Sequence, residues 1–205
     1  MTYEMLVALA GFAFVMSISP GPANFILLAS GVNFGFRRSL PIVLGISFGF
    51  LSMVLAVGLG LGPVLKAYPS VNMALKIACA AYVFWLALKI ARSAPASVTD
   101  ADRSEKPISF LQAAVLQLVN PKAWAVALIV TVSYTTPANY VASLVAMIAV
   151  FAVVNLPAIS MWALFGVGLR RILHDPARVR VFNVVMALLL AGSMVPVLLD
   201  VPLWS

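Results

Sequence analysis

The sequence contains very little charge. Asp, Glu, Lys and Arg make up 9% of its 205 residues, hydrophobic residues make up 63%, and the mean hydropathy is +1.09. A soluble domain carries about 25% charged residues, so this composition excludes a soluble protein and predicts an all-α integral membrane protein in a lipid bilayer. The net charge of +7 does not indicate nucleic-acid binding, because the basic residues are spread over short segments between apolar runs.

Cysteine, histidine and intramembrane carboxylates are also scarce. The chain has one cysteine and one histidine, which excludes an intrachain disulfide and a multi-cysteine metal site. The six acidic residues all lie outside the apolar runs: Glu4, Asp100, Asp102, Glu105, Asp175 and Asp200. An intramembrane enzyme or electron carrier would need paired carboxylates, paired cysteines or a histidine within a span. We therefore predict no enzyme, no cofactor and no metal, and proton coupling would have to use Lys122, a tyrosine or the substrate.

Six long apolar runs predict six transmembrane helices, at about 5–28, 40–64, 71–91, 108–132, 140–169 and 181–199. The only extended polar segment, 92–107, has the composition of a flexible linker. We predict one membrane domain made of two three-helix halves, residues 1–91 and 108–205, joined by this linker.

The basic residues predict the orientation. Ten of the 13 fall in three segments that six spans place on one side of the membrane: Arg37, Arg38, Lys89, Arg92, Arg103, Lys106, Arg170, Arg171, Arg178 and Arg180. The positive-inside rule makes this side, with the linker, cytoplasmic and puts both termini outside. We interpret the arginines as topology anchors, with gating as the alternative, and expect a short loop holding Gly31, Gly35, Arg37 and Arg38 between the first two spans.

The first apolar run is interrupted by Ser19-Pro20-Gly21-Pro22-Ala23-Asn24, although the 32 residues from Met5 to Phe36 carry no charge. The two prolines lack backbone donors and disfavour a continuous helix. In lipid, a broken helix is tolerated only where protein or a water-lined cavity surrounds the freed groups. Transporters build substrate sites at such breaks, so we select four candidate site residues: Pro20, Gly21, Pro22 and Asn24. The alternative is a packing kink, or a helix end near the interface.

A second motif, Asn120-Pro121-Lys122, interrupts the fourth run. Each half then begins with a broken helix, and three spans per half make the halves run in opposite directions. This pattern predicts an inverted repeat with broken helices 1 and 4 and a site between the breaks, to which Asn120, Pro121 and Lys122 also belong.

The polar residues at the breaks each allow two interpretations. A charge near the bilayer centre costs about 2.5–3.5 kcal/mol, so Lys122 is expected to contact a substrate carboxylate or counter-ion. Alternatively, Lys122 snorkels or caps the carbonyls freed at Pro121. Asn24 and Asn120 either coordinate a zwitterionic amino acid or satisfy each other's broken backbones. The helix ends after Pro22 and Pro121 are expected to offer free amides to a carboxylate.

Further candidates lie on the second and fifth spans. Gly45 and Gly49 form a small-xxx-small pattern, and we expect them to pack the second helix against the broken first one, beside the site. Asn155, with Pro157, could form a third break, but an interhelical hydrogen bond is the preferred role. A tilt or a kink is expected in this span because it is longer than needed. Four further residues are interpreted as helix contacts or packing: Gln112, Gln117, Trp124 and Trp162.

The ordered motifs resemble the lysine exporter (LysE/RhtB) family of amino-acid exporters. The resemblance covers nearly the whole chain and rests on Ser19-Pro20-Gly21-Pro22 with Asn24, Gly35 with Arg37, Gly45 with Gly49, and Asn120-Pro121-Lys122. Three local sequences are most similar to the cysteine/O-acetylserine exporter branch: Gly21-Pro22-Ala23-Asn24, Ile108-Ser109-Phe110 and Gln117-Leu118-Val119-Asn120.

The resemblance implies a secondary transporter that exports small amino acids or their derivatives by alternating access across the bacterial cytoplasmic membrane. The implied substrates are of the cysteine/O-acetylserine, threonine or homoserine class. The alternatives are a channel-like or structural membrane subunit, or an exporter of another small solute. A channel needs a continuous polar lining, whereas polarity here is concentrated at two breaks. A homo-oligomer stays open, because small-xxx-small packing serves one chain as well as a dimer.

Overall fold

The protein consists of α-helices and short connections in the residues that the computed structural model describes: 1–60, 69–93, 107–135, 137–170, 172–173, 175–192 and 195. The helices are α1 (Tyr3–Ile18), α2 (Pro22–Phe34), α3 (Phe36–Gly58), α5 (Pro69–Arg92), α6 (Phe110–Val119), α7 (Pro121–Tyr134), η1 (Pro137–Asn139), α8 (Tyr140–Arg170) and α9 (Pro176–Gly192). No strand occurs in these ranges, so the all-α prediction is confirmed for them. Most of the predicted linker, with Arg103 and Lys106, lies outside the described residues, as does Arg171.

Several helices have the length and composition of membrane spans. Two single helices, α3 and α8, are long and apolar enough to cross a bilayer. Two helix pairs meet the same criterion together, α1 with α2, bent by 57°, and α6 with α7, bent by 69°. The helix therefore breaks at both predicted motifs. Neither α5 nor the described part of α9 is among these helices. Large apolar side chains face outward, such as Val132 and Val153, which are 80% and 74% exposed, as expected for a surface in lipid.

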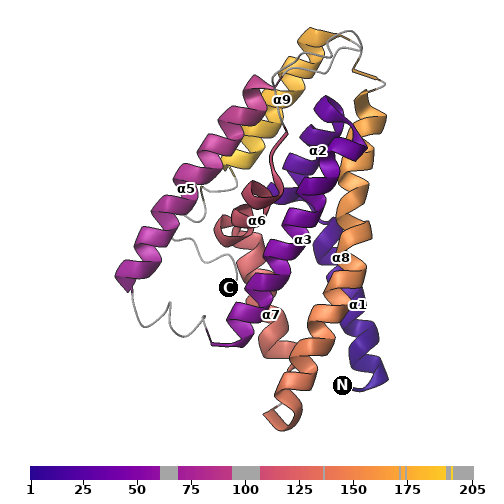
Figure 1. Cartoon of the computed structure of the whole chain (residues 1–205), viewed down its shortest axis with the longest axis vertical. Coiled ribbons are helices and arrows are strands. Elements are labelled where there is room, and N and C mark those ends of the chain that lie inside the picture. The colour runs from indigo at the N-terminus through magenta and orange to yellow at the C-terminus, as the bar shows by residue number, and fades with distance from the viewer. Residues whose placement is uncertain are drawn as a thin grey trace.

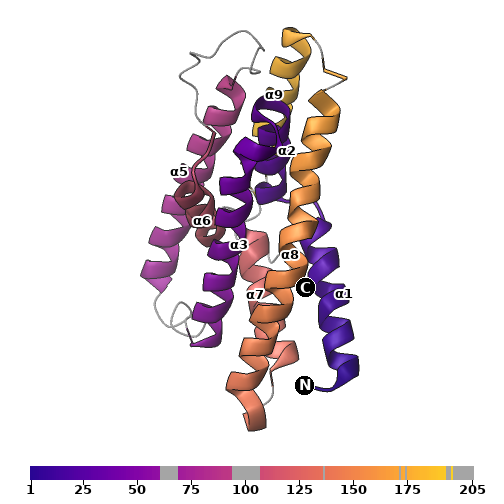
Figure 2. The ribbon, with the colours of Figure 1, turned by 45° about the vertical axis from the view of Figure 1, so that its right-hand side comes forward.

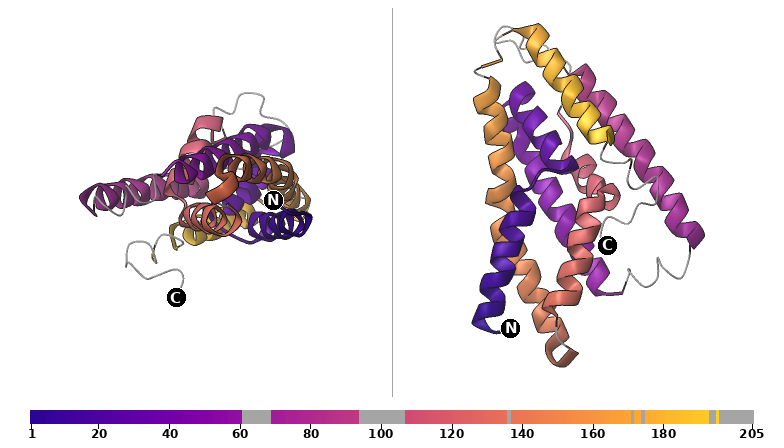
Figure 3. Two further views of the ribbon diagram at one scale, coloured as in Figure 1. Left: turned by 90° about the horizontal axis from the view of Figure 1, so that it is seen from below. Right: turned by 180° about the vertical axis from the view of Figure 1, so that it is seen from behind.

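The helices form a central bundle with an inclined arm. Figures 1 and 2 show α2, α3 and α8 running through the centre, with α1 and α7 below the two bends. The arm consists of α5 and α9, which pack on each other, and the view from behind in Figure 3 shows it diverging from α1 and α7. The most extensive contacts join α2 to α8 and α3 to α6, so elements from the two halves of the chain are interleaved.

Glycines permit the two closest helix crossings. Gly31 on α2 meets Gly166 on α8, and a Cβ at Gly31 would overlap the carbonyl oxygen of Ala163. On α3, Cβ atoms at Gly45 and Gly49 would overlap backbone carbonyls of α6. The prediction that Gly45 and Gly49 face the broken first helix is therefore wrong. Their partner is α6, the first part of the broken fourth span, because the two broken spans flank α3 and the glycines face the second of them.

The connection between α2 and α3 is a single residue instead of the predicted loop. Gly35 has φ +77, in the left-handed region that a residue without Cβ adopts at little cost. This one residue turns the chain, so α2 continues to Phe34 and α3 begins at Phe36. Gly31 consequently lies inside α2, and Arg37 and Arg38 lie in the first turn of α3.

The fifth predicted span is one uninterrupted helix. α8 runs for 31 residues with Pro157 inside it, so no third break occurs there. The basic segment that follows this span lies largely within helices. Arg170 ends α8, and Arg178 and Arg180 lie in α9. The long α8 thereby supplies a continuous wall to both breaks.

Candidate functional site

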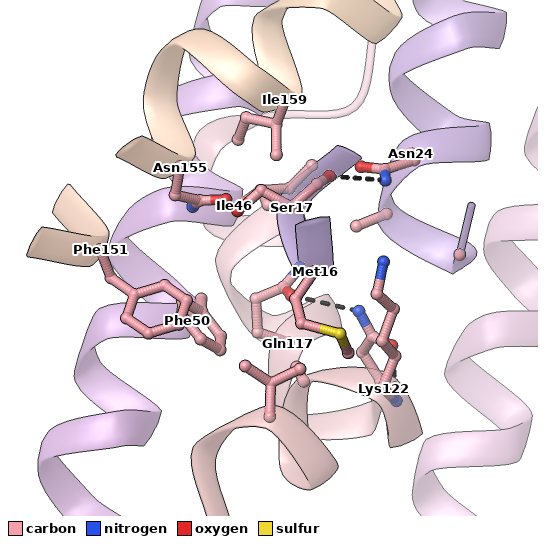
Figure 4. Close-up of a pocket in the computed structure, with 15 residues that line it drawn as sticks. Met16, Ser17, Asn24, Ile46, Phe50, Gln117, Lys122, Phe151, Asn155 and Ile159 are labelled. Atoms are coloured by element: carbon pink, nitrogen blue, oxygen red, sulfur yellow. Dashed lines mark hydrogen bonds between the residues drawn. The ribbon is translucent and has the colours of Figure 1, made fainter. Parts of the chain in front are cut away.

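The two helix breaks meet at one cavity (Figure 4). Its volume is about 50 Å³, and its walls come from the end of α1, the start of α2, the middle of α3 and α8, and both sides of the α6–α7 break. A volume of this size has room for a few water molecules. Two apolar core clusters contribute to its lining, one through Ile46 and Ile159 and the other through Phe50 and Phe151. The cavity therefore lies inside the protein, where the core divides.

The first break leaves the start of α2 without a cap. Its N-cap residue is Gly21, which has no side chain to accept a hydrogen bond, and Pro22 at the first helical position has no N–H. Among the described residues, the amides of Ala23 and Asn24 have no hydrogen-bond partner. Ala23 and Asn24 both line the cavity. The uncapped end of α2 thus supplies two unpaired donors and the positive end of a helix dipole.

The last carbonyls before the first break accept hydrogen bonds from side chains of α2 and α8. The Asn24 Nδ2 donates to the carbonyls of Ser17 at 3.0 Å and Ser19 at 2.7 Å. The indole of Trp162, on α8, donates to the Ile18 carbonyl at 3.1 Å. Asn24 therefore satisfies its own broken backbone, so the predicted exchange, in which Asn24 and Asn120 satisfy each other's breaks, is wrong.

Lys122 reaches from the second break to the first. Its Nζ donates to the Ser19 carbonyl at 2.5 Å, and its stem lies against Gly21, where an added Cβ would come within 2.9 Å of the Lys122 Cδ. Lys122 does cap a freed carbonyl, but not one at Pro121 as the alternative prediction had it. Among the described residues, Lys122 is the only charged one that lines the cavity, and none of the others lining it is a carboxylate.

The second break is closed by its own residues. The Asn120 Oδ1 accepts a hydrogen bond from the Lys122 amide at 3.2 Å, and the Asn120 carbonyl accepts from the amides of Ala123 and Trp124. The Asn120 Nδ2 donates to Gln117 Oε1 at 3.2 Å. The prediction that the helix start after Pro121 offers free amides is therefore wrong. Asn120 caps α7 in the manner of an N-cap residue and leaves those donors paired.

Two more amides border the cavity. Asn155 donates from Nδ2 to the Ser47 hydroxyl at 3.0 Å, which joins α8 to α3 and is the interhelical bond that the sequence predicts. Within the described residues, Asn24 Oδ1 and Asn155 Oδ1 accept no hydrogen bond, and both residues line the cavity. Gln117, interpreted as a helix contact, also lines the cavity. The cavity therefore presents unpaired acceptors as well as a cation.

The remaining predicted site residues lie near the cavity without lining it. Pro20 connects α1 to α2, and Pro22 and Pro121 begin the second part of each broken pair. Gly45 and Gly49 hold α3 against α6, and the residue of α3 that faces the cavity between them is Ile46. These residues shape the site through the backbone.

Comparison with known proteins identifies the family. The family described as LysE type translocator matches residues 14–200. The chain belongs to this family. The cysteine/O-acetylserine efflux proteins of Escherichia coli (strain K12) and Shigella sonnei (strain Ss046) are 32% identical to it over 192 residues, which cover 93% of this chain and 95% of each relative. No solved structure matches the chain.

Family membership makes this protein a membrane translocator and not an enzyme. The predicted resemblance to the lysine exporter family, and to its cysteine/O-acetylserine branch, is confirmed.

The apolar wall of the translocator cavity was not predicted from the sequence. Phe50 and Phe151 pack with ring centroids 5.1 Å apart and face the cavity beside Met16. They lie in long, mainly apolar helices, in which a phenylalanine can face lipid, as the exposed Phe48 does, as well as a cavity. Trp124 and Trp162 were interpreted as packing residues, yet each donates its indole N–H to a carbonyl at a break.

Proposed function

We propose that this translocator exports small neutral α-amino acids or their derivatives, of the cysteine and O-acetylserine class, across the bacterial cytoplasmic membrane. The observation that carries the proposal is the cavity between the two breaks, which holds one cation, Lys122, and the uncapped start of α2. The similarity to cysteine/O-acetylserine efflux proteins over 93% of the chain supports the substrate class.

The substrate carboxylate binds between Lys122 and the start of α2. The ammonium group of Lys122 has three donors and one recorded hydrogen bond, to the Ser19 carbonyl. The amides of Ala23 and Asn24 supply further donors at a helix N-terminus, where anions are stabilised. An anion in this position would also neutralise a cation that has no carboxylate beside it in the cavity.

The substrate ammonium group binds the unpaired amide oxygens. Asn24 and Asn155 both line the cavity, and the Oδ1 of each accepts no hydrogen bond within the described residues. Their Nδ2 atoms donate to the Ser17 carbonyl and to the Ser47 hydroxyl. The apolar side chains that line the rest of the cavity, such as Phe50, Phe151 and Ile159, favour a neutral side chain over a charged one such as that of lysine, because burying an unpaired charge is costly.

The architecture that serves this function is a pair of inverted repeats. Residues 1–91 and 108–205 form the two three-helix halves, each beginning with a broken helix, and 92–107 is a cytoplasmic linker. Six spans then place both termini outside, as the positive-inside rule requires. Alternating access would rock one half against the other around the cavity.

Transport into inverted membrane vesicles, whose lumen corresponds to the outside of the cell, tests the proposal. A panel of labelled amino acids, including cysteine, O-acetylserine, threonine, leucine and lysine, is offered to the wild-type protein and to Lys122→Met and Lys122→Arg variants. Saturable export of the small neutral class is expected, abolished in Lys122→Met and partly kept in Lys122→Arg, because arginine retains the charge.

The control is Lys89→Met. Lys89 also lies in an apolar helix, α5, but contacts Gln112 and Trp85 and does not line the cavity. Its loss should leave export unchanged. If Lys122→Met exports at the wild-type rate at equal membrane abundance, the proposed carboxylate site at Lys122 is wrong. If the wild-type protein exports no amino acid, the proposed function is wrong.

A further inference from the structure

The cavity has a charged side and an aromatic side. Figure 4 shows Lys122 on one side and the Phe50–Phe151 pair on the other, with the side chain of Met16 between them. Phe50 comes from α3 and Phe151 from α8, their rings are inclined by 57°, and their exposed fractions are 7% and 1%. Two buried rings from different helices therefore close the cavity opposite its cation.

We propose that Phe50 and Phe151 determine which substrates are exported, by limiting the length of the side chain that the cavity accepts. This inference rests on the proposed function. With the carboxylate held at Lys122 and the ammonium group at the amide oxygens, the substrate's Cα is placed between them. Its side chain then points toward the apolar wall, where the aromatic pair stands.

The rings cannot retreat from a longer side chain. Both belong to a buried cluster that includes Met53, Val54 and Met147, all at most 1% exposed. Protein interiors are close-packed, so moving a ring outward displaces these neighbours and strains their rotamers. The limit on side-chain length is therefore steric and abrupt.

The wall also favours the chemistry of short sulfur-containing side chains. Thiol and thioether sulfur atoms make favourable contacts with aromatic rings. The wall carries no polar side chain of its own that would be left unpaired by an apolar or weakly polar substrate. The accepted class is thus α-amino acids with short, weakly polar side chains.

Competition between a short and a long substrate tests this inference. Methionine and cysteine are added together to inverted vesicles under reducing conditions. The readout is the ratio of the initial rates at which the two amino acids accumulate inside. A ratio does not depend on how much protein reaches the membrane. Phe50→Leu and Phe151→Leu are made separately, since leucine preserves the apolar core while shortening the wall.

We expect the methionine-to-cysteine ratio to rise by about tenfold or more in at least one variant, because one methylene in an apolar pocket discriminates by 10–200-fold. Phe48→Leu is the matched control. Phe48 lies on the same helix, is 58% exposed and packs on Phe110 away from the cavity. Its ratio should equal that of the wild type.

Three outcomes overturn the inference. An unchanged ratio in both cavity variants, with cysteine export intact, overturns it alone. Non-saturable leakage of all solutes in both variants also overturns it. The aromatic pair would then act as a gate that closes the pathway, and it would not select substrates by the length of their side chains. Absence of amino-acid export by the wild-type protein would overturn the proposed function together with the inference.

Discussion

At the second helix break, Asn120 caps the following helix through the Lys122 amide and donates to Gln117 in the preceding helix, and these bonds join residues only two and three positions apart. At the first break, Gly21 provides no cap, and the Ser19 carbonyl is held by Asn24 and by Lys122, which lies 103 positions away. The two breaks share a proline and an asparagine but satisfy their backbones differently.

The difference indicates which break responds to a substrate. The second break has paired its own donors and holds its shape without help. The first depends on Lys122, whose ammonium group a bound carboxylate would share with the Ser19 carbonyl. A substrate bound there would contact both halves of the chain, so its affinity would depend on their relative position.

Removing Asn24 should have the largest effect on stability. Asn24→Ala deletes a buried hydrogen bond to the Ser17 carbonyl, which loses its donor, and a part-buried one to the Ser19 carbonyl, which keeps Lys122; a buried acceptor left unsatisfied costs about 1–3 kcal/mol. We expect the free energy of unfolding in detergent, followed by tryptophan fluorescence, to fall by about 2–4 kcal/mol. A loss no greater than that of Asn120→Ala would contradict the dependence of the first break on long-range partners.

Crowding Lys122 should impair transport more than folding. Gly21 has an extended backbone, so alanine is allowed there, but its Cβ would displace the Lys122 stem. We expect Gly21→Ala to reduce the apparent substrate affinity about tenfold, equivalent to about 1.4 kcal/mol, in vesicle efflux assays. Gly11→Ala, with nothing within 4 Å of the new Cβ, is the control and should transport normally.

The second break should lose its helix cap and the hydrogen bond to Gln117 when Asn120 is replaced. Asn120→Ala removes the acceptor for the Lys122 amide, and an N-cap loss costs about 1 kcal/mol. Asn120→Ser should recover most of this loss in the free energy of unfolding, because serine also accepts from a first-turn amide. Failure of serine to rescue stability would show that the cap is not the role that matters.

The two tryptophans give the smallest and most closely matched comparison. Trp162→Phe removes a part-buried bond to the first break, and Trp124→Phe removes an exposed bond to the second. We expect losses in the free energy of unfolding of about 1 kcal/mol and about 0.5 kcal/mol respectively, because water replaces an exposed partner. Equal losses would argue against a more demanding first break.

The sequence predicted the helix breaks because proline and asparagine within apolar runs act locally. It also predicted that Asn155 bonds across helices and that Lys122 is not free. It did not predict the partner of Lys122, because which carbonyl an ammonium reaches depends on how two distant segments cross. The partner of Gly45 and Gly49 was missed for the same reason.

Other errors came from connections and from uniform hydrophobicity. The loop expected around Gly35 proved to be one residue, because a left-handed glycine can reverse the chain where composition suggests a longer turn. The aromatic pair Phe50–Phe151 was not predicted, since a phenylalanine in a long apolar helix can face lipid as well as a cavity. A buried polar link at the other end of the bundle, the reciprocal amide pair of Asn33 and Asn183, carries no local motif and was also missed.

The most direct test of the central claim compares an amino acid with its amine. Binding of cysteine and of cysteamine, which lacks the carboxylate, is measured by titration calorimetry on the purified wild-type protein and on Lys122→Met. We predict that the wild type binds cysteine at least about tenfold more tightly than cysteamine, as a charge-assisted hydrogen bond of about 1.5–3 kcal/mol requires, and that Lys122→Met loses this preference. Equal binding of both ligands by the wild type, or a preference that survives in Lys122→Met, would contradict the placement of the carboxylate at Lys122.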